Sequence, residues 1–172
     1  MKRHILLIGL PGAGKTTVGR LVAEQLQTGF VDVDAAIIRK MGMPVAQIFG
    51  QFGEAKFREV EREITDGAIQ GPPCVISPGG GWAAQDGAIE GARASSLIIY
   101  VKVSATTAAK RSEGESTRPL LAGQDSNEQM RLLLKEREPH YLKADAEVKA
   151  DTTGAAGVAS QIVALAHQRA GW

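Results

Sequence analysis

The chain has 172 residues, of which 44% are hydrophobic and 23% charged, with a formal net charge of +1. Its length predicts a single domain over residues 1–172. The near-neutral charge provides no broad field for nucleic acid or an anionic membrane, so we expect neither partner. The one cysteine, Cys74, excludes an internal disulfide. The apolar run near the N-terminus is too short for a membrane span or a signal core, so we expect a cytoplasmic protein.

Apolar strand patterns alternate with helical patterns along the chain. Residues 5–8 form a continuous apolar run, typical of a strand buried on both faces, and a glycine-rich turn follows at once. Further strands are expected over residues 30–34, 74–76, 97–103 and 146–148, and helices over residues 18–26, 35–41, 54–69, 84–93, 106–111, 127–141 and 158–168, with a short apolar turn over residues 45–49. This order predicts an α/β fold with a parallel sheet covered by helices on both faces.

Residues 9–16 read GLPGAGKT, which matches the phosphate-binding pattern G-x-x-x-x-G-K-[ST] without a gap. Glycines let the backbone turn tightly and direct successive N–H groups toward one point, and the following helix directs its positive end there. Lys15 can reach the β- and γ-phosphates of a nucleoside triphosphate, and the Thr16 hydroxyl can bind Mg²⁺. The strand before the motif and the helix after it are the context that a P-loop requires, so we expect ATP and Mg²⁺ as ligands.

Two carboxylates follow the second expected strand. Asp32 and Asp34 are two residues apart, so in an extended chain they point to the same side. At the carboxyl edge of a parallel sheet they would face the ligand crevice. One could hold the water shell of Mg²⁺ and the other could accept a hydroxyl proton. The alternative is a pair of aspartates that only caps the next helix.

A glycine cluster and three arginines also suggest a kinase, but less strongly. Gly79, Gly80 and Gly81 close the third expected strand, as needed where a ligand touches bare backbone, although an ordinary loop has the same composition. Arg118 lies in a polar segment, residues 112–124, that has the character of a mobile lid, where an arginine can close over phosphates or remain solvated. Arg58 and Arg137 lie on the polar faces of two expected helices, where each could clamp a substrate carboxylate, although the pattern alone favours a solvated charge.

Taken together, these motifs resemble the shikimate kinase family over nearly the whole chain. The pieces occur in order: GLPGAGKTTVGRLVA, FVDVD, IFGQFGEAKFREVE, GGG, RPLL and ERE-P-HY. The resemblance implies a nucleoside-monophosphate-kinase-like P-loop fold with a five-stranded parallel sheet and a lid. It also implies a monomer that transfers the γ-phosphate of ATP to the 3-hydroxyl of shikimate, a step of aromatic amino-acid biosynthesis.

The resemblance also assigns roles to individual residues, with a substrate-binding segment at about residues 33–61. Lys15, Asp34 and Arg118 would be catalytic, with Asp34 as a base. Thr16 and, through water, Asp32 would hold Mg²⁺. ATP would contact Gly12, Ala13, Gly14, Lys15, Thr16, Thr17, Arg111 and Arg118, with Arg111 packed on the adenine. Shikimate would contact Asp34, Phe49, Phe57, Arg58, Gly79, Gly80, Gly81 and Arg137.

The sequence departs from the family pattern at Ser77-Pro78, at His140 and at Trp82, which follows the glycines where a small residue is usual. Trp82 would either lie buried behind the loop or narrow the acceptor pocket. The alternatives to shikimate phosphorylation are therefore another small-acceptor kinase, with a sugar acid or a nucleotide as substrate, and a nucleotide-binding module without transfer activity.

Overall fold

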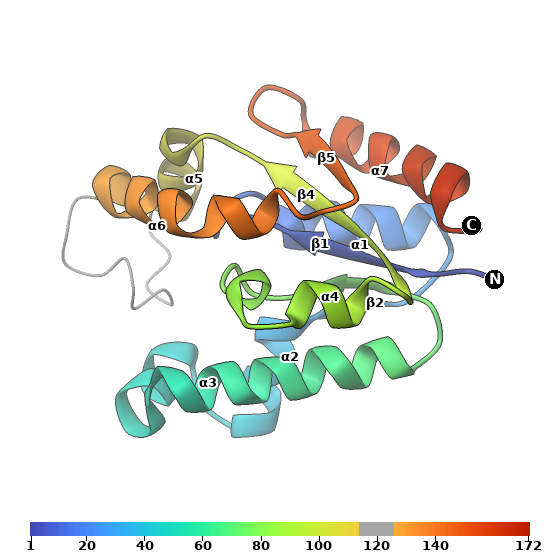
Figure 1. Cartoon of the computed structure of the whole chain (residues 1–172). Helices are drawn as coiled ribbons and strands as arrows, with labels where there is room; N and C mark the ends of the chain where they lie inside the picture. Colours follow the sequence, from blue (N-terminus) through green and yellow to red (C-terminus); the bar gives the residue numbers. More distant parts are fainter. Residues whose placement is uncertain (114–125) are drawn as a thin grey trace.

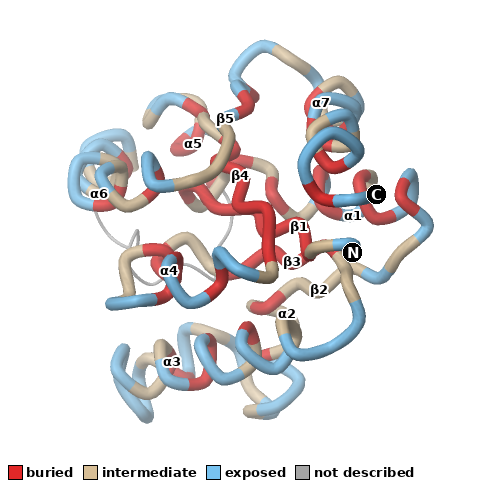
Figure 2. Tube along the Cα trace, turned by 45° about the vertical axis from the view of Figure 1, so that its right-hand side comes forward, coloured by how far each residue is buried: buried red, intermediate tan, exposed pale blue. Residues whose placement is uncertain are grey.

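The computed structural model describes residues 1–113 and 126–172 and contains a five-stranded sheet in which every pairing is parallel. The strand order is β2-β3-β1-β4-β5. The strands are β1 (His4–Ile8), β2 (Phe30–Asp32), β3 (Val75–Ser77), β4 (Ser96–Lys102) and β5 (Ala146–Lys149). Every residue of β1 and β3 is buried, as the apolar runs predicted, and these strands form the centre of the molecule (Figure 2). The predicted fold class is confirmed.

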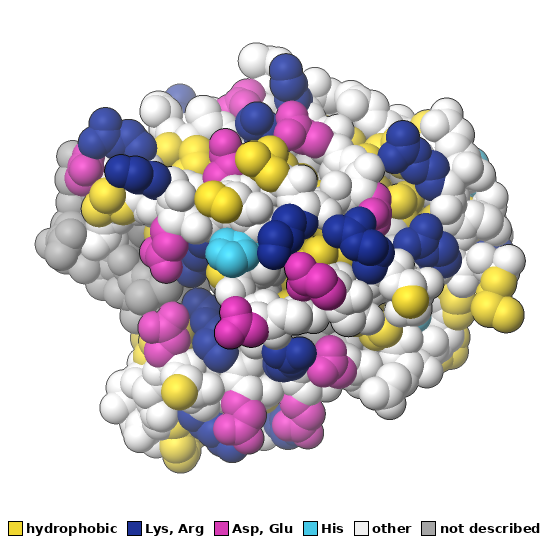
Figure 3. All heavy atoms as spheres, in the orientation of Figure 1, with side chains coloured by type: hydrophobic (Ala, Val, Ile, Leu, Met, Phe, Trp, Pro, Cys, Tyr) yellow, Lys and Arg dark blue, Asp and Glu magenta, His cyan; other side chains and the backbone are white. Residues whose placement is uncertain are grey.

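Helices cover both faces of this sheet (Figure 1). The helix α1 (Lys15–Gln25) packs beside α7 (Ala155–Arg169) on one face, while α4 (Ala88–Ala92) and α6 (Ser126–Tyr141) lie on the other. The helix α5 (Ala105–Ser112) contacts α6, and α2 (Val33–Met41) contacts α3 (Val45–Gln70). On the face drawn in Figure 3, cationic and anionic side chains are interspersed. Within the described residues, no helix combines the length and apolar character that crossing a membrane requires.

Three expected elements differ from those observed. The second strand ends at Asp32, because the carboxylate of that residue accepts a hydrogen bond from the Ala35 N–H at 3.2 Å and begins α2. The expected turn over residues 45–49 is helical and forms the first part of α3, which bends at Gly53, where φ is 81°. The expected helix over residues 84–93 is divided into a short 3₁₀ turn, η1 (Trp82–Ala84), and α4.

Candidate active site

The turn between β1 and α1 has the geometry of an anion cradle. Gly12 and Gly14 adopt positive φ, and Gly14 is the N-cap of α1, so the helix begins at Lys15. A Cβ at Gly12 would lie 2.4 Å from the Ala108 carbonyl oxygen, so this position has no room for a side chain. The Lys15 ammonium is buried and donates to the carbonyls of Gly9 and Leu10, each at 2.8 Å. The loop therefore combines backbone N–H groups, a helix N-terminus and a held cation.

One cavity of about 300 Å³ connects this cradle with Asp32, Asp34 and part of the glycine loop, whereas Arg58, Gly81 and Arg137 do not line it. Its wall includes Asp32 at the end of β2, Asp34 in the first turn of α2, and two of the three glycines after β3. The residues that line it are Gly12, Gly14, Lys15, Thr16, Thr17, Asp32, Asp34, Ser77, Pro78, Gly79, Gly80 and Arg111. The carboxyl ends of β1, β2 and β3 therefore meet at a single cleft, as a parallel sheet requires.

The two aspartates reach this cavity by a different route from the one predicted. Asp32 is the N-cap of α2, and Asp34 lies in the first helical turn rather than at the end of a strand. The alternation of side chains in an extended strand is therefore the wrong reason for their proximity. Asp32 does cap the helix, and its carboxylate also accepts from the Thr16 hydroxyl at 3.4 Å, while its part in binding Mg²⁺ stays a prediction.

The glycine loop after β3 is tightly surrounded by charged side chains of the protein. A Cβ at Gly79 would lie 2.2 Å from Glu61 Oε2 and 3.1 Å from Asp34 Oδ1. At Gly81 it would lie 2.6 Å from the Arg58 guanidinium carbon. None of these glycines has a positive φ. A side chain at either position would displace these charged groups, so their close approach favours glycine here, and the predicted contact with a ligand stays a prediction.

The same loop brings Arg58 and Arg137 to one side of the cavity. Arg58 lies against Gly81, and Arg137 Nη1 would be 3.1 Å from a Cβ at Gly80. Arg137 is only 6% exposed, so it is not a solvated helix charge. Two guanidinium groups beside a carboxylate-bearing P-loop pocket can bind a small anion that also carries hydroxyl groups.

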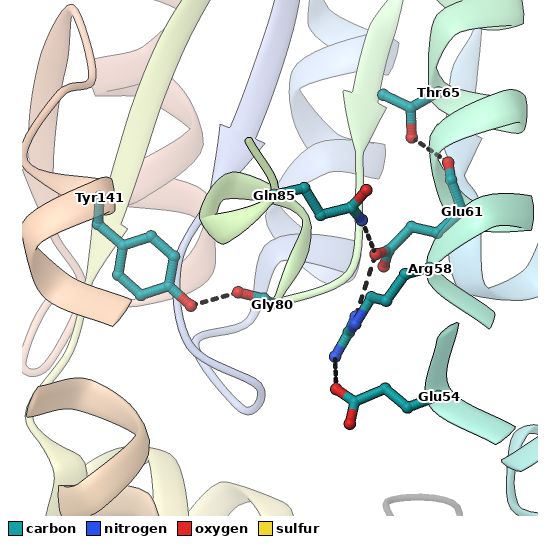
Figure 4. Close-up of polar contacts among 7 residues, drawn as sticks. All are labelled: Glu54, Arg58, Glu61, Thr65, Gly80, Gln85 and Tyr141. Carbon is teal, nitrogen blue, oxygen red and sulfur yellow. Dashed lines mark hydrogen bonds and ion pairs between the residues drawn. The ribbon is translucent and has the colours of Figure 1, made fainter. Parts of the chain in front are cut away.

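Glu61 is a member of this cluster that the sequence did not single out. It lies on α3 one turn after Arg58 and is fully buried. Its carboxylate accepts from Arg58 at 3.0 Å and from the Gln85 amide at 2.8 Å (Figure 4). Burial raises the pKa of Glu61 against the opposing effect of the Arg58 guanidinium, and the nearby Asp34 carboxylate raises it further. The i, i+3 spacing on a helix was the signal that could have revealed the pair.

A second cavity, of about 290 Å³, lies next to the cradle on the side of α7. It shares Gly14, Thr17 and Arg111 with the first cavity. Its wall is completed by Thr153 and Gly154 in the loop before α7, by Ala155 and Val158 on α7, and by Ala13, Val18 and Ala150. Arg111 is held between the two by hydrogen bonds to the carbonyls of Ala150, at 2.9 Å, and Ala13, at 3.4 Å. The contribution of residues 153–155 to a cavity wall was not predicted from the sequence.

Two predicted wall residues lie on either side of the bend in α3. The rings of Phe49 and Phe57 are 4.9 Å apart, and the Arg58 guanidinium lies 5.3 Å from the centre of the Phe57 ring. Neither ring lines the cavity itself. The Phe57 ring contacts the Arg58 guanidinium, and both rings pack in or against the hydrophobic core. Arg118, and the predicted lid except for residues 112 and 113, lie outside the described residues.

Comparison with known proteins identifies the family of this chain. The shikimate kinase family model matches residues 11–167. The chain is 45% identical over 152 residues to a shikimate kinase of Mycobacterium avium (strain 104), which covers 88% of this chain and 85% of that protein. The chain belongs to the shikimate kinase family. The resemblance inferred from its motifs is confirmed.

Solved structures agree with this assignment. A shikimate kinase from Acinetobacter baumannii in complex with shikimate superposes with a TM-score of 0.93 at 31% identity, over 98% of this chain and 94% of that one. A gluconokinase from Sinorhizobium meliloti 1021 superposes with a TM-score of 0.67 at 20% identity, over 99% and 94% of the two chains, and shows a shared fold alone.

Trp82, which was expected to depart from the family pattern, is buried behind the glycine loop. It is 1% exposed, packs within the core and does not line the cavity. Its indole Nε1 is buried and has no hydrogen-bond partner among the described residues. The first of the two predicted alternatives is therefore correct. Ser77 and Pro78, the other departures near this loop, do line the cavity.

Replacement of Trp82 is expected to affect stability rather than acceptor recognition. Trp82→Ala should lower the free energy of unfolding by about 3–5 kcal/mol, because it leaves a large void in the core. Trp82→Phe should cost less, because it keeps most of the ring. Urea unfolding and the KM for shikimate at a permissive temperature measure both effects. A KM that falls severalfold in Trp82→Phe, with unchanged stability, would mean that the indole narrows the pocket.

The raised pKa of Glu61 predicts a specific pH dependence. A raised carboxyl pKa means that the folded state favours the protonated form, so this contribution to stability is complete below the ordinary value of 4.5 and is lost as the pH rises through the folded-state pKa. Glu61→Gln removes the titration. The unfolding free energy of the unmodified protein minus that of Glu61→Gln should therefore fall between pH 4 and pH 8.

Glu63→Gln is the control, because Glu63 lies exposed on the same helix and Lys40 holds its pKa below the ordinary value. The unfolding free energy of the unmodified protein minus that of Glu63→Gln should rise with pH, opposite to the Glu61 difference, and the change should be small. Urea unfolding at several pH values measures both slopes. Equal slopes for the two variants would show that Glu61 titrates like an exposed carboxyl group.

Proposed function

We propose that the chain phosphorylates the 3-hydroxyl of shikimate with ATP. The observation that carries this proposal is the single cavity that contains both the P-loop and Asp34, with Arg58 and Arg137 at its glycine-loop side. A phosphate cradle, a carboxylate and two guanidinium groups are what an acidic, hydroxylated acceptor and a triphosphate require together. Membership of the shikimate kinase family supports the same substrate.

In this proposal each part of the cavity has one task. The cradle around Lys15 holds the β- and γ-phosphates, and the cavity beside Arg111 accepts the adenine. Arg58 and Arg137 hold the acceptor carboxylate, and Asp34 binds the acceptor hydroxyl and accepts its proton. Phosphoryl transfer depends mainly on positioning and on charge stabilisation, which these fixed groups provide. Arg118 is proposed to complete the phosphate contacts from the lid.

Thr16 and Asp32 are the residues that would hold Mg²⁺. The Thr16 hydroxyl and the Asp32 carboxylate are 3.4 Å apart in the wall of the cavity, next to the cradle. Hydroxyl and carboxylate oxygens suit Mg²⁺, which keeps several waters and binds phosphates at the same time. When bound, the ion neutralises charge on the transferred phosphoryl group.

An assay with an acceptor panel tests this function. ADP release is coupled to NADH oxidation with shikimate, gluconate or AMP as acceptor, and Asp34→Asn is the background control. We expect turnover with shikimate alone. Gluconate turnover faster than shikimate turnover would support the sugar-acid alternative, and ATP binding without turnover on any acceptor would support a non-catalytic module.

A further inference from the structure

Tyr141, the last residue of α6, connects this helix to the glycine loop. It is fully buried, and its hydroxyl donates to the Gly80 carbonyl at 2.5 Å (Figure 4). Gly80 lines the main cavity, and its Cα is enclosed between Pro11 of the P-loop and Arg137 of α6. A hydrogen bond to this carbonyl therefore fixes the plane of the peptide that joins Gly80 to Gly81.

The same hydroxyl interacts with Arg137, which precedes Tyr141 by one helical turn. Burial raises the pKa of Tyr141 to about 12, while the interacting Arg137 guanidinium opposes that rise. The hydroxyl is therefore protonated at neutral pH. A hydroxyl group can donate once and accept twice, so it can donate to Gly80 and accept from Arg137 at the same time. The Tyr141 hydroxyl bonds Gly80, and Arg137 Nη1 would lie 3.1 Å from a Cβ on the same glycine, so these three groups meet at the acceptor side of the cavity.

The Tyr141 ring is itself held in a single orientation. It packs on the Tyr100 ring with centroids 5.1 Å apart, and Tyr100 is also buried. The Tyr100 hydroxyl points elsewhere and donates to Glu138 at 3.2 Å. The stacked pair therefore contains one hydroxyl directed at the acceptor site and one directed away from it.

We propose that Tyr141 is a positioning residue for acceptor binding, which fixes the positions of the Gly80 peptide and the Arg137 guanidinium relative to each other. This inference rests on the proposed function, in which those two groups hold shikimate. Tyr141 acts through them and does not touch the reacting atoms. Its contribution therefore belongs to acceptor binding, and ATP binding on the cradle of residues 9–16 is independent of it.

The test is Tyr141→Phe, which removes only the hydroxyl oxygen. We expect the KM for shikimate to rise roughly three- to tenfold, the size expected for one lost hydrogen bond in a buried network. The KM for ATP should stay within about twofold, because the Tyr141 hydroxyl bonds the Gly80 carbonyl and not the backbone of residues 9–16, although Gly80 packs beside Pro11. Tyr100→Phe is the matched control, because it removes a hydroxyl from the other buried ring of the stack. It should leave both KM values unchanged.

A double-mutant cycle with Arg137→Lys separates positioning from general loosening of the core. If Tyr141 acts partly through the Arg137 guanidinium, Tyr141→Phe should have a smaller effect once Arg137 is replaced by lysine. We expect its effect on the free energy derived from kcat/KM for shikimate to be less than half of that in the otherwise unmodified protein. Equal effects in both backgrounds, or a Tyr141→Phe variant whose only change is a lower unfolding temperature, would overturn the proposal. Failure of the unmodified protein to phosphorylate shikimate would instead overturn the proposed function.

Discussion

Lys15→Met is expected to lower kcat/KM for ATP by roughly 10²–10³-fold, the effect of removing one fixed charge from a developing phosphate anion. In the structure the Lys15 ammonium is buried beneath the cradle and held by two carbonyl groups, so it is fixed before ATP arrives. Methionine retains the length of the side chain but has no donor. Steady-state kinetics with ATP varied at saturating shikimate measure the loss.

Lys149→Met, on the exposed edge of β5, is the control for the loss of one positive charge. It should change kcat/KM by less than twofold. Lys15→Met also leaves the carbonyls of Gly9 and Leu10 without this donor, so unfolding must be measured in parallel; a cost of about 1–3 kcal/mol is expected. A Lys15→Met variant that is folded and turns over within tenfold of the unmodified protein would contradict the assignment of the cradle.

Asp34→Asn is expected to lower kcat by about 10²–10⁴-fold, because an amide cannot accept the hydroxyl proton during transfer. Asp34 lines the cavity together with Asp32, and of the two it is the one whose carboxylate lies close to Gly79 of the acceptor loop. Asparagine has nearly the same shape, so the glycine loop should keep its position. Single-turnover kinetics with bound ATP separate this chemical effect from acceptor binding.

The matched control is Asp66→Asn, which neutralises an exposed carboxylate on α3 paired with Arg62 at 3.8 Å. It should leave kcat within twofold, since surface pairs contribute little. If Asp34→Asn kept more than a tenth of the kcat, the proton would have to leave by another route. Asp34 would then be assigned to acceptor binding alone.

The sequence predicted the features that depend on local pattern. The apolar run at residues 5–8, the P-loop and the glycines after β3 each combine composition with spacing, and each lies in the expected element. The second strand was predicted two residues too long, because the capping carboxylate of Asp32 begins a helix that apolar alternation does not reveal. The five parallel strands were predicted, whereas their order, β2-β3-β1-β4-β5, was not, because no local pattern shows which strands are neighbours.

The roles of side chains that depend on tertiary contacts were harder to predict. Arg58 and Arg137 were assigned to the site only by resemblance, since nothing in a helix pattern distinguishes a solvated arginine from one packed on a glycine 20 or more residues away. Glu61 and Tyr141 were missed for the same reason, although each lies one turn from a predicted arginine. Their partners at residues 80 and 85 are brought close by the sheet, not by the helix that carries them.

The most direct test of the whole account is a crystal structure of the protein with shikimate and ADP. We predict the shikimate carboxylate between Arg58 and Arg137, a ring hydroxyl within hydrogen-bond distance of Asp34, and the ADP phosphates on residues 9–16. Shikimate bound away from this cavity, or with its carboxylate directed at Asp34 and its hydroxyl groups at the arginines, would contradict the account.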